Sequence, residues 1–364
     1  MRNQATGLSA LFVLSLVIMA CSGTTADVKK VGLVTDVGTL EDKSFNEASW
    51  VGAQAGAKAL AGTSSNIVTK APADYAANIK TFVDQGYGTI VTVGFAMGDA
   101  TTIAAKQYPN VKFIGVDQGV CIDEAGKGDP TFACKGDPKA LLPNYQGLVF
   151  KEEHVGYLAG VLAGSVSKSG VVGTVGGINT IPPVVRYING YRNGAASVNA
   201  DIDVQVAYVS TDITKAFNDP GTGKSIAQQM IDKKADVIFQ VAGLSGAGSI
   251  EAACATPGVI GLGVDVDQSK SLPQSAKCIL SSAEKKLSNA IEAAIKKIGA
   301  KTDVGGTTVW DASTDPVGVG LSPFGSDYKD LVTPEIQAKL DAALAGMKDG
   351  TIDPCKPTPC DKKD

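Results

Sequence analysis

The chain has 364 residues, of which 44% are hydrophobic, 19% charged and 6% aromatic, and its 33 Lys and Arg face 37 Asp and Glu. This composition is typical of a soluble globular chain of about two domains and excludes a disordered, collagen-like or polytopic membrane protein. The formal charge of −4 and the pI of about 5.2 argue against nucleic acid or an anionic membrane surface as the main partner, because both require clustered cations.

Residues 1–20 are predicted to be an export signal. Arg2 precedes an apolar stretch over 8–20 that is too short to span a bilayer comfortably. The stretch ends in the sequence IMAC (18–21), which resembles the lipobox of bacterial lipoproteins, whose peptidase cuts before a lipidated cysteine. We therefore expect Cys21 to carry a lipid such as palmitate, residues 21–29 to form a tether, and the protein to lie on the extracytoplasmic face of a bacterial cell membrane. A plain secretory signal and a short membrane anchor are the alternatives.

Short β-branched runs alternate with longer amphipathic ones along the rest of the chain. The predicted strands cover residues 30–35, 89–93, 111–116, 170–175, 204–209, 237–241, 259–264 and 278–281. The predicted helices cover residues 44–61, 75–85, 99–107, 152–167, 184–198, 225–233, 248–253, 284–298 and 333–350. This alternation predicts an α/β fold with parallel sheets and helices on both faces.

Two local patterns refine this prediction. Ser44 and Glu47 have the spacing of a capping box, in which each side chain bonds the other residue's amide. Val116-Asp117-Gln118 and Val264-Asp265 each end a strand, about one lobe apart in the chain. Ligands of open α/β sheets bind at the carboxyl ends of the strands, so two lobes that each end in a carboxylate predict a shared site between them.

Apart from Cys21, the cysteines form three sequence-local pairs. An even number in an exported chain favours disulfides, although other connectivities stay open. The alternative, a zinc site, lacks a CxxC motif, and the only histidine, His154, has no cysteine near it in sequence. We therefore predict no metal and expect three local disulfides, Cys121 with Cys134, Cys254 with Cys278, and Cys355 with Cys360.

A series of motifs resembles the basic membrane protein family, the PnrA-like purine nucleoside-binding lipoproteins of ABC importers. The likeness covers about residues 28–325 in order. Its motifs are TDVG (35–38), EDKSFN (41–46), GVDQ (115–118), KEEHVGYLAG (151–160), GYRNG (190–194), FNDP (217–220), AGLSG (242–246), GVD (263–265), LSSAEK (280–285) and GLSPF (320–324).

The resemblance implies a type I periplasmic-binding-protein fold, in which two Rossmann-like lobes enclose a hinged cleft. The chain is expected to cross between the lobes near 145–151, 265–268 and 301–308. These crossovers assign residues 30–146 plus 266–300 to the N-terminal lobe and residues 147–265 plus 301–330 to the C-terminal lobe. Residues 331–364 then form a C-terminal helix and tail.

The resemblance also implies the ligand-binding residues. Phe45 and Phe217 lie in polar surroundings where a core aromatic is out of place, and by resemblance they sandwich the base. Asn46 and Asp117 are expected to bind the edge of the base. Asp36 corresponds to another acid in the binding pocket of the family. Asp265 and Lys285 fit the ribose diol, and Gly243 allows close approach of the backbone. Each acid taken alone also suits a helix N-cap, and Lys286 is an alternative to Lys285.

These observations predict a substrate-binding lipoprotein that captures purine nucleosides and passes them to an ABC transporter permease, without a cofactor. Sugar or other small-solute binding or sensing on the same fold, and an antigen or adhesin role, are the alternatives. An enzyme is not expected. The segment GTGKS (221–225) lacks the first glycine of a P-loop, because Asn218 occupies that position, and His154 has no GxSxG elbow to accompany it.

Overall fold

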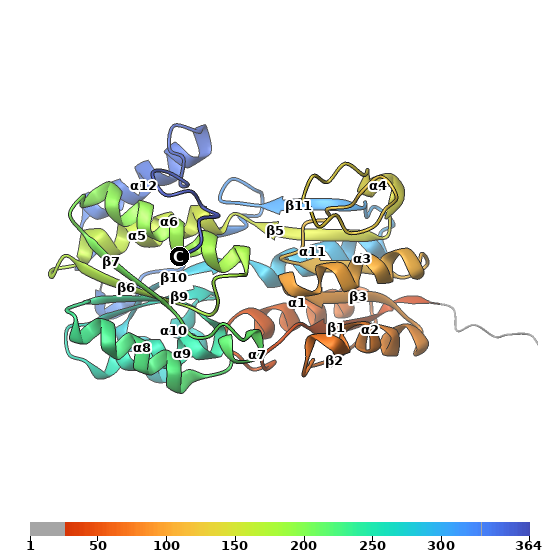
Figure 1. Cartoon of the computed structure of the whole chain (residues 1–364), viewed down its shortest axis with the longest axis horizontal. Coiled ribbons are helices and arrows are strands. Elements are labelled where there is room, and N and C mark those ends of the chain that lie inside the picture. The colour runs from red at the N-terminus through yellow and green to blue at the C-terminus, as the bar shows by residue number, and fades with distance from the viewer. Residues whose placement is uncertain (1–25, 329) are drawn as a thin grey trace, which may run out of the picture.

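The computed structural model describes residues 26–328 and 330–364, and they form two α/β lobes side by side (Figure 1). This arrangement confirms the predicted fold class. The proposed signal segment and Cys21 lie outside the described residues. No helix within the described part of the chain combines the length and apolarity that a membrane span requires.

The first lobe is built on a sheet of parallel strands in the order β11-β5-β4-β3-β1-β2. Its strands are β1 (Asp27–Thr35), β2 (Thr63–Ile67), β3 (Tyr87–Val93), β4 (Lys112–Val116), β5 (Tyr145–Phe150) and β11 (Gly306–Trp310). The helices that accompany it are α1 (Phe45–Ala59), α2 (Tyr75–Asp84), α3 (Gly98–Gln107), the short α4 (Pro138–Leu141) and α11 (Leu287–Gly299).

The second lobe has a sheet in the order β12-β10-β9-β8-β6-β7, in which only β12 is antiparallel to its neighbour. Its strands are β6 (Val171–Gly176), β7 (Asp203–Tyr208), β8 (Val237–Val241), β9 (Ile260–Asp265), β10 (Ile279–Lys285) and β12 (Val319–Leu321). Its helices are α5 (Glu152–Val166), α6 (Pro182–Val198), α7 (Ile213–Ala216), α8 (Pro220–Asp232), α9 (Gly243–Ala255), α10 (Gln268–Ser271) and α12 (Pro334–Asp349).

The chain crosses between the lobes three times, and two of the crossovers differ from the prediction. The first lies between β5 and α5, near the expected segment 145–151, although the predicted boundary after residue 146 cuts through β5, which pairs in the first sheet. The second follows β10 and not residues 265–268, because β10 pairs in parallel with β9 and so extends the second sheet. The third lies between β11 and β12, because β11 pairs with β5 of the first sheet. The predicted division at 266–300 and 301–330 therefore places β10 and β11 in the wrong lobes.

The predicted strands omit β2, β5, β11 and β12. β2 has the polar sequence TSSNI, and β12 is only three residues long, so neither carries a hydrophobic pattern. β2, β11 and β12 lie at sheet edges, where one side of the strand has no partner in the sheet. The three predicted disulfides are confirmed: Cys121–Cys134, Cys254–Cys278 and Cys355–Cys360.

Helices α5 and α6 pack closely because glycines face each other along their contact. A Cβ built on Gly160 would overlap the carbonyl oxygen of Tyr191, and one built on Gly194 would overlap that of Tyr157. The remaining face of α6 buries Tyr187 and Tyr191 against the second sheet, and the Tyr191 ring stacks on that of Phe239 at 5.0 Å between centroids. This packing fixes α6 between a helix and a sheet.

We expect Gly160→Ala to lower the free energy of unfolding by about 1–3 kcal/mol, because the added methyl group has no room beside the α6 backbone. Gly98→Ala is the matched control, since a Cβ built there meets no atom within 4 Å. The control should be neutral or stabilising by about 0.4–1 kcal/mol, through reduced entropy of the unfolded chain. Urea unfolding followed by circular dichroism measures both, and equal stabilities would contradict the close packing.

Candidate functional site

A cavity of about 80 Å³, partly open to solvent, lies between the two lobes. The cavity brings together all eight residues predicted to bind ligand: Asp36, Phe45, Asn46 and Asp117 from the first lobe, and Phe217, Gly243, Asp265 and Lys285 from the second. Asp42, Phe95, Ile181, Pro183, Val184 and Tyr187 also line it, and the sequence did not single them out.

Four of the charged residues that line the cavity stand at the carboxyl ends of strands. Asp36 follows β1, Asp117 follows β4, and Asp265 and Lys285 are the last residues of β9 and β10. Asp117 and Asp265 both have left-handed backbone conformations, with φ of 58° and 63°. Non-glycine residues other than Asn and Asp seldom adopt this conformation, and it occurs often at functional sites. The two lobes thus present equivalent acids in the same way.

Lys285 is the cation of the cavity, and it is held by two carboxylates. Its Nζ lies 2.7 Å from Oδ2 of Asp117 and 2.9 Å from Oε1 of Glu152. Burial lowers the pKa of Lys285, but the charges of Asp117, Glu152 and Asp265 outweigh it, so the net shift is upward. Lys285 therefore stays charged, and it pairs with Asp117, whereas the resemblance associates it with Asp265.

Glu152, the first residue of α5, is missed by the sequence analysis. It is only 1% exposed. An acid in the first turn of a helix is common on solvent-exposed surfaces, so nothing in the sequence marks it as a partner of Lys285. Within the described residues, its Oε2 has no hydrogen-bond partner. Burial, partly offset by Lys285, raises the pKa of Glu152 to about 7.

The predicted capping box at the start of α1 is wrong, because Asp42 caps the helix instead. The Asp42 carboxylate accepts bonds from the amides of Ser44, Asn46 and Glu47 at 2.9, 2.8 and 3.1 Å. Ser44 is thereby free to donate its hydroxyl to Oδ2 of Asp265 at 2.6 Å. This bond joins the first lobe to the second. Ser44, which was predicted to cap α1, therefore connects the two lobes.

Asn46 offers the cavity an acceptor. Its Nδ2 donates to the main-chain oxygens of Val37 and Thr39 at 3.0 and 3.1 Å, which fixes the side-chain amide. Its Oδ1 is buried and has no hydrogen-bond partner among the described residues. A buried polar atom without a partner is costly and uncommon. Asn46 can therefore accept a hydrogen bond from a bound molecule, whereas its donors are already used.

Aromatic and aliphatic side chains form the rest of the cavity wall. Phe45 begins α1 in the first lobe, with the Lys285 ammonium 5.2 Å from its ring centroid. Phe217 follows α7 in the second lobe, and its ring packs so closely on Gly177 that a Cβ there would overlap it. Both rings are half-buried. Two half-buried phenyl rings from opposite lobes provide flat apolar surfaces for a ligand.

Burial also shifts the protonation of the other acids. It raises the pKa of Asp36 to about 7, with a further contribution from the charge of Asp117. Burial likewise raises the pKa of Asp42 to about 7, although three backbone amides oppose the shift. The pKa of Asp265 is also raised by burial, against the opposing effect of Lys285. Among the described residues, no group of three or more His, Cys, Asp or Glu has the geometry to hold a metal ion.

The raised pKa of Asp36 predicts how stability depends on pH. A carboxyl with a folded pKa of about 7 and an unfolded pKa near 4 contributes stability below pH 4 that is lost as the pH rises through 7. The ligand-free protein should therefore melt at a higher temperature at pH 5 than at pH 8, and Asp36→Asn should reduce that difference. Exposed Asp201→Asn is the control. Identical pH profiles for the parent and Asp36→Asn, followed by circular dichroism, would refute the assignment.

Solved structures with the same architecture include solute-binding proteins and transcription regulators. An ABC transporter solute-binding protein from Aeropyrum pernix superposes with a TM-score of 0.75 at 22% identity, covering 89% of this chain and 92% of that one. A periplasmic solute-binding protein from Actinobacillus succinogenes with bound D-allose superposes with a TM-score of 0.55 at 16% identity, covering 78% of this chain and 95% of that one. At these identities the likeness establishes the fold alone.

Sequence relatives are more specific. The ABC transporter nucleoside-binding protein BmpA of Lactococcus lactis is 30% identical over 94% of this chain and 97% of its own length. Basic membrane protein A of Borreliella burgdorferi is 32% identical over 71% of this chain and 70% of its own. The family model described as ABC transporter substrate-binding protein PnrA-like matches residues 29–344. The chain therefore belongs to the Bmp family of PnrA-like ABC transporter substrate-binding proteins.

Proposed function

We propose that this substrate-binding protein captures a purine nucleoside between its lobes and delivers it to the permease of an ABC importer, while a lipid on Cys21 anchors it to the cell membrane. The observation that carries the proposal is the pairing of Phe45 and Phe217 across a cavity edged with carboxylates. The name of the Lactococcus relative, a nucleoside-binding protein, supports the same ligand class.

In this proposal the base lies between the two phenyl rings. Stacking of a base on an aromatic side chain contributes about 1–3 kcal/mol. Asn46 Oδ1 accepts a hydrogen bond from a base N–H, and Asp117 accepts a second. Asp36, with its pKa near 7, is partly protonated at neutral pH and then donates its O–H to a ring nitrogen. These contacts suit the mixed donors and acceptors of a purine.

In this proposal the ribose binds to residues of the second lobe. Asp265 accepts hydrogen bonds from the diol, and the Lys285 ammonium lies among the same side chains. Gly243, with φ of 54°, begins α9 and brings its backbone to the cavity. Ligand then contacts both lobes at once, so contacts that exist only in the closed form shift the hinge equilibrium toward closure.

Phe217→Ala should weaken inosine or guanosine binding by about 5- to 150-fold, because one stacking surface is lost. Phe132→Ala is the matched control, since Phe132 lies in the first lobe with 70% of its surface exposed. Isothermal titration calorimetry measures both affinities. Unchanged affinity for Phe217→Ala would remove this residue from the site, and strong ribose or galactose binding without nucleoside binding would refute the ligand class.

The anchor is tested separately. Cys21→Ser should abolish incorporation of radiolabelled palmitate in a bacterial host and move the protein from the membrane fraction to the soluble fraction, because the thiol is the attachment point. Cys121→Ser/Cys134→Ser is the control, because those thiols form a disulfide and should not affect labelling. Labelling that persists in the Cys21→Ser protein would contradict the lipid anchor.

A further inference from the structure

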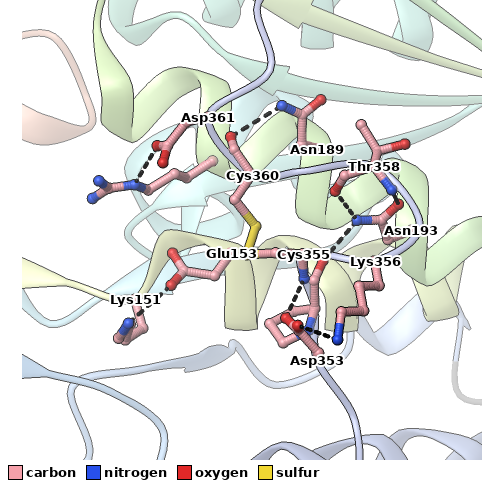
Figure 2. Close-up of a disulfide and its surroundings, with 12 residues drawn as sticks. Lys151, Glu153, Asn189, Asn193, Asp353, Cys355, Lys356, Thr358, Cys360 and Asp361 are labelled. Atoms are coloured by element: carbon pink, nitrogen blue, oxygen red, sulfur yellow. Dashed lines mark hydrogen bonds and ion pairs between the residues drawn. A yellow bond between two sulfur atoms is a disulfide. The ribbon is translucent and has the colours of Figure 1, made fainter.

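The last residues of the chain lie against the second lobe, beyond the segment that the family model matches. We call residues 351–364 the strap. It follows α12, and the disulfide Cys355–Cys360 closes a small loop within it over the outer side of α5 and α6 (Figure 2). Cys360 is 6% exposed, so the strap covers protein surface and does not project into solvent.

Asn193 of α6 holds the first part of the strap. This side chain is 2% exposed. Its Nδ2 donates to the main-chain oxygens of Pro354 and Thr358, both at 2.8 Å, and its Oδ1 accepts from the amide of Thr358 at 3.0 Å. Every polar atom of this buried side chain is thus bonded to the strap.

Asn189, one turn earlier on the same helix, holds the second part. It is 1% exposed, and its Nδ2 donates to the main-chain oxygens of Cys360 and Lys362 at 3.0 and 2.8 Å. The two asparagines therefore bind carbonyl groups on both sides of the disulfide loop (Figure 2). The disulfide fixes the spacing of those carbonyls, because it limits the conformations of the loop between them.

The final residue, Asp364, joins three elements of the second lobe. Its carboxylate lies 2.7 Å from Arg192 of α6 and accepts a bond from the hydroxyl of Tyr208, at the end of β7, at 3.3 Å. Its main-chain oxygen accepts from Nδ2 of Asn179 at 3.0 Å, and Asn179 lies in the loop between β6 and α6. The strap thus ends on the loop that leads into α6.

The same loop and the first turn of α6 form part of the second-lobe wall of the cavity. Ile181 ends the loop, and Pro183 and Val184 lie in the first turn of α6; all three line the cavity. Gly177 in the loop supports the ring of Phe217. The strap therefore contacts the outer side of the β6–α6 loop and α6, and the inner side of both elements faces the cavity.

We propose that the strap is part of the ligand-binding apparatus: it holds the β6–α6 loop through Asp364 and the middle of α6 through Asn189 and Asn193, so that these three residues are positioning residues for the part of the second-lobe wall that the loop and α6 form. A wall that is already ordered in the free protein loses less conformational entropy when ligand binds. The choice of inosine as a probe rests on the proposed function, whereas the ordering of the wall does not.

The test compares the parent with a chain that ends at Gly350, with Cys355→Ser/Cys360→Ser, and with Asp364→Ala. Cys121→Ser/Cys134→Ser is the matched control, because it removes a disulfide of the first lobe that does not line the cavity. Calorimetry with inosine measures affinity, and hydrogen exchange over residues 177–187 in the ligand-free protein measures local order. Asp364→Glu is the conservative variant that should restore the contact.

The chain that ends at Gly350 should bind inosine about fivefold or more weakly, the lower range of coupling between separate sites. The other two strap variants should change affinity in the same direction by less, and all three should exchange faster over residues 177–187. The control and Asp364→Glu should match the parent. Affinity and local exchange that stay at parental values in all strap variants would overturn the proposal, even where thermal stability falls.

The outcomes separate the two proposals. A parent that binds no inosine would refute the proposed ligand, while the exchange of residues 177–187 would still decide the role of the strap. If the shortened chain does not fold, Cys355→Ser/Cys360→Ser and Asp364→Ala decide the question, because both retain the whole strap.

Discussion

The Lys285 ammonium is buried where the two lobes meet, and the surrounding structure has to neutralise it. Moving a lone cation out of water costs several kcal/mol, so it must be paired. Asp117 reaches it from the end of β4, and Glu152 reaches it from the start of α5, just after the first crossover. Three elements that are distant in sequence thus converge on one charge. The pair with Asp117 crosses between the lobes, so the same contact that satisfies the cation also brings the lobes together.

This charge balance also favours an uncharged ligand. Asp36, Asp42, Asp117 and Asp265 line the cavity, and Lys285 is the cation among its lining residues. Because Asp117 and Glu152 already neutralise that cation, a phosphate group would meet carboxylates without a free positive partner. A nucleoside avoids this repulsion, and a nucleotide does not. Burial and the charges of neighbouring carboxylates raise the pKa values of Asp36 and Asp42, because a neutral carboxyl is easier to bury and is not repelled by its neighbours.

Much of the fold and the placement of two cavity acids followed from the sequence, because hydrophobic runs that end in a carboxylate mark the carboxyl edge of a parallel sheet, whereas the other cavity residues were implied by the family resemblance. Asp117 and Asp265 are such positions. Glu152 and Asp42 were not predictable in this way, because one resembles an ordinary first-turn acid and the other was hidden by the apparent capping box of Ser44 and Glu47. The sequence predicts the disulfide of the strap but not where the strap docks, because Asn189 and Asn193 hold it through main-chain oxygens, which every sequence supplies.

The two lobes satisfy each other's acids reciprocally. Asp117 of the first lobe is met by Lys285 of the second, and Asp265 of the second lobe is met by Ser44 of the first. Both acids therefore already have protein hydrogen-bond donors in the ligand-free protein. A nucleoside that donates N–H or O–H groups to Asp117 or Asp265 shares these acids with protein donors, whereas Asn46 Oδ1 has no partner among the described residues and gains a bond outright. Stacking of the base on Phe45 and Phe217 then adds to these polar contacts.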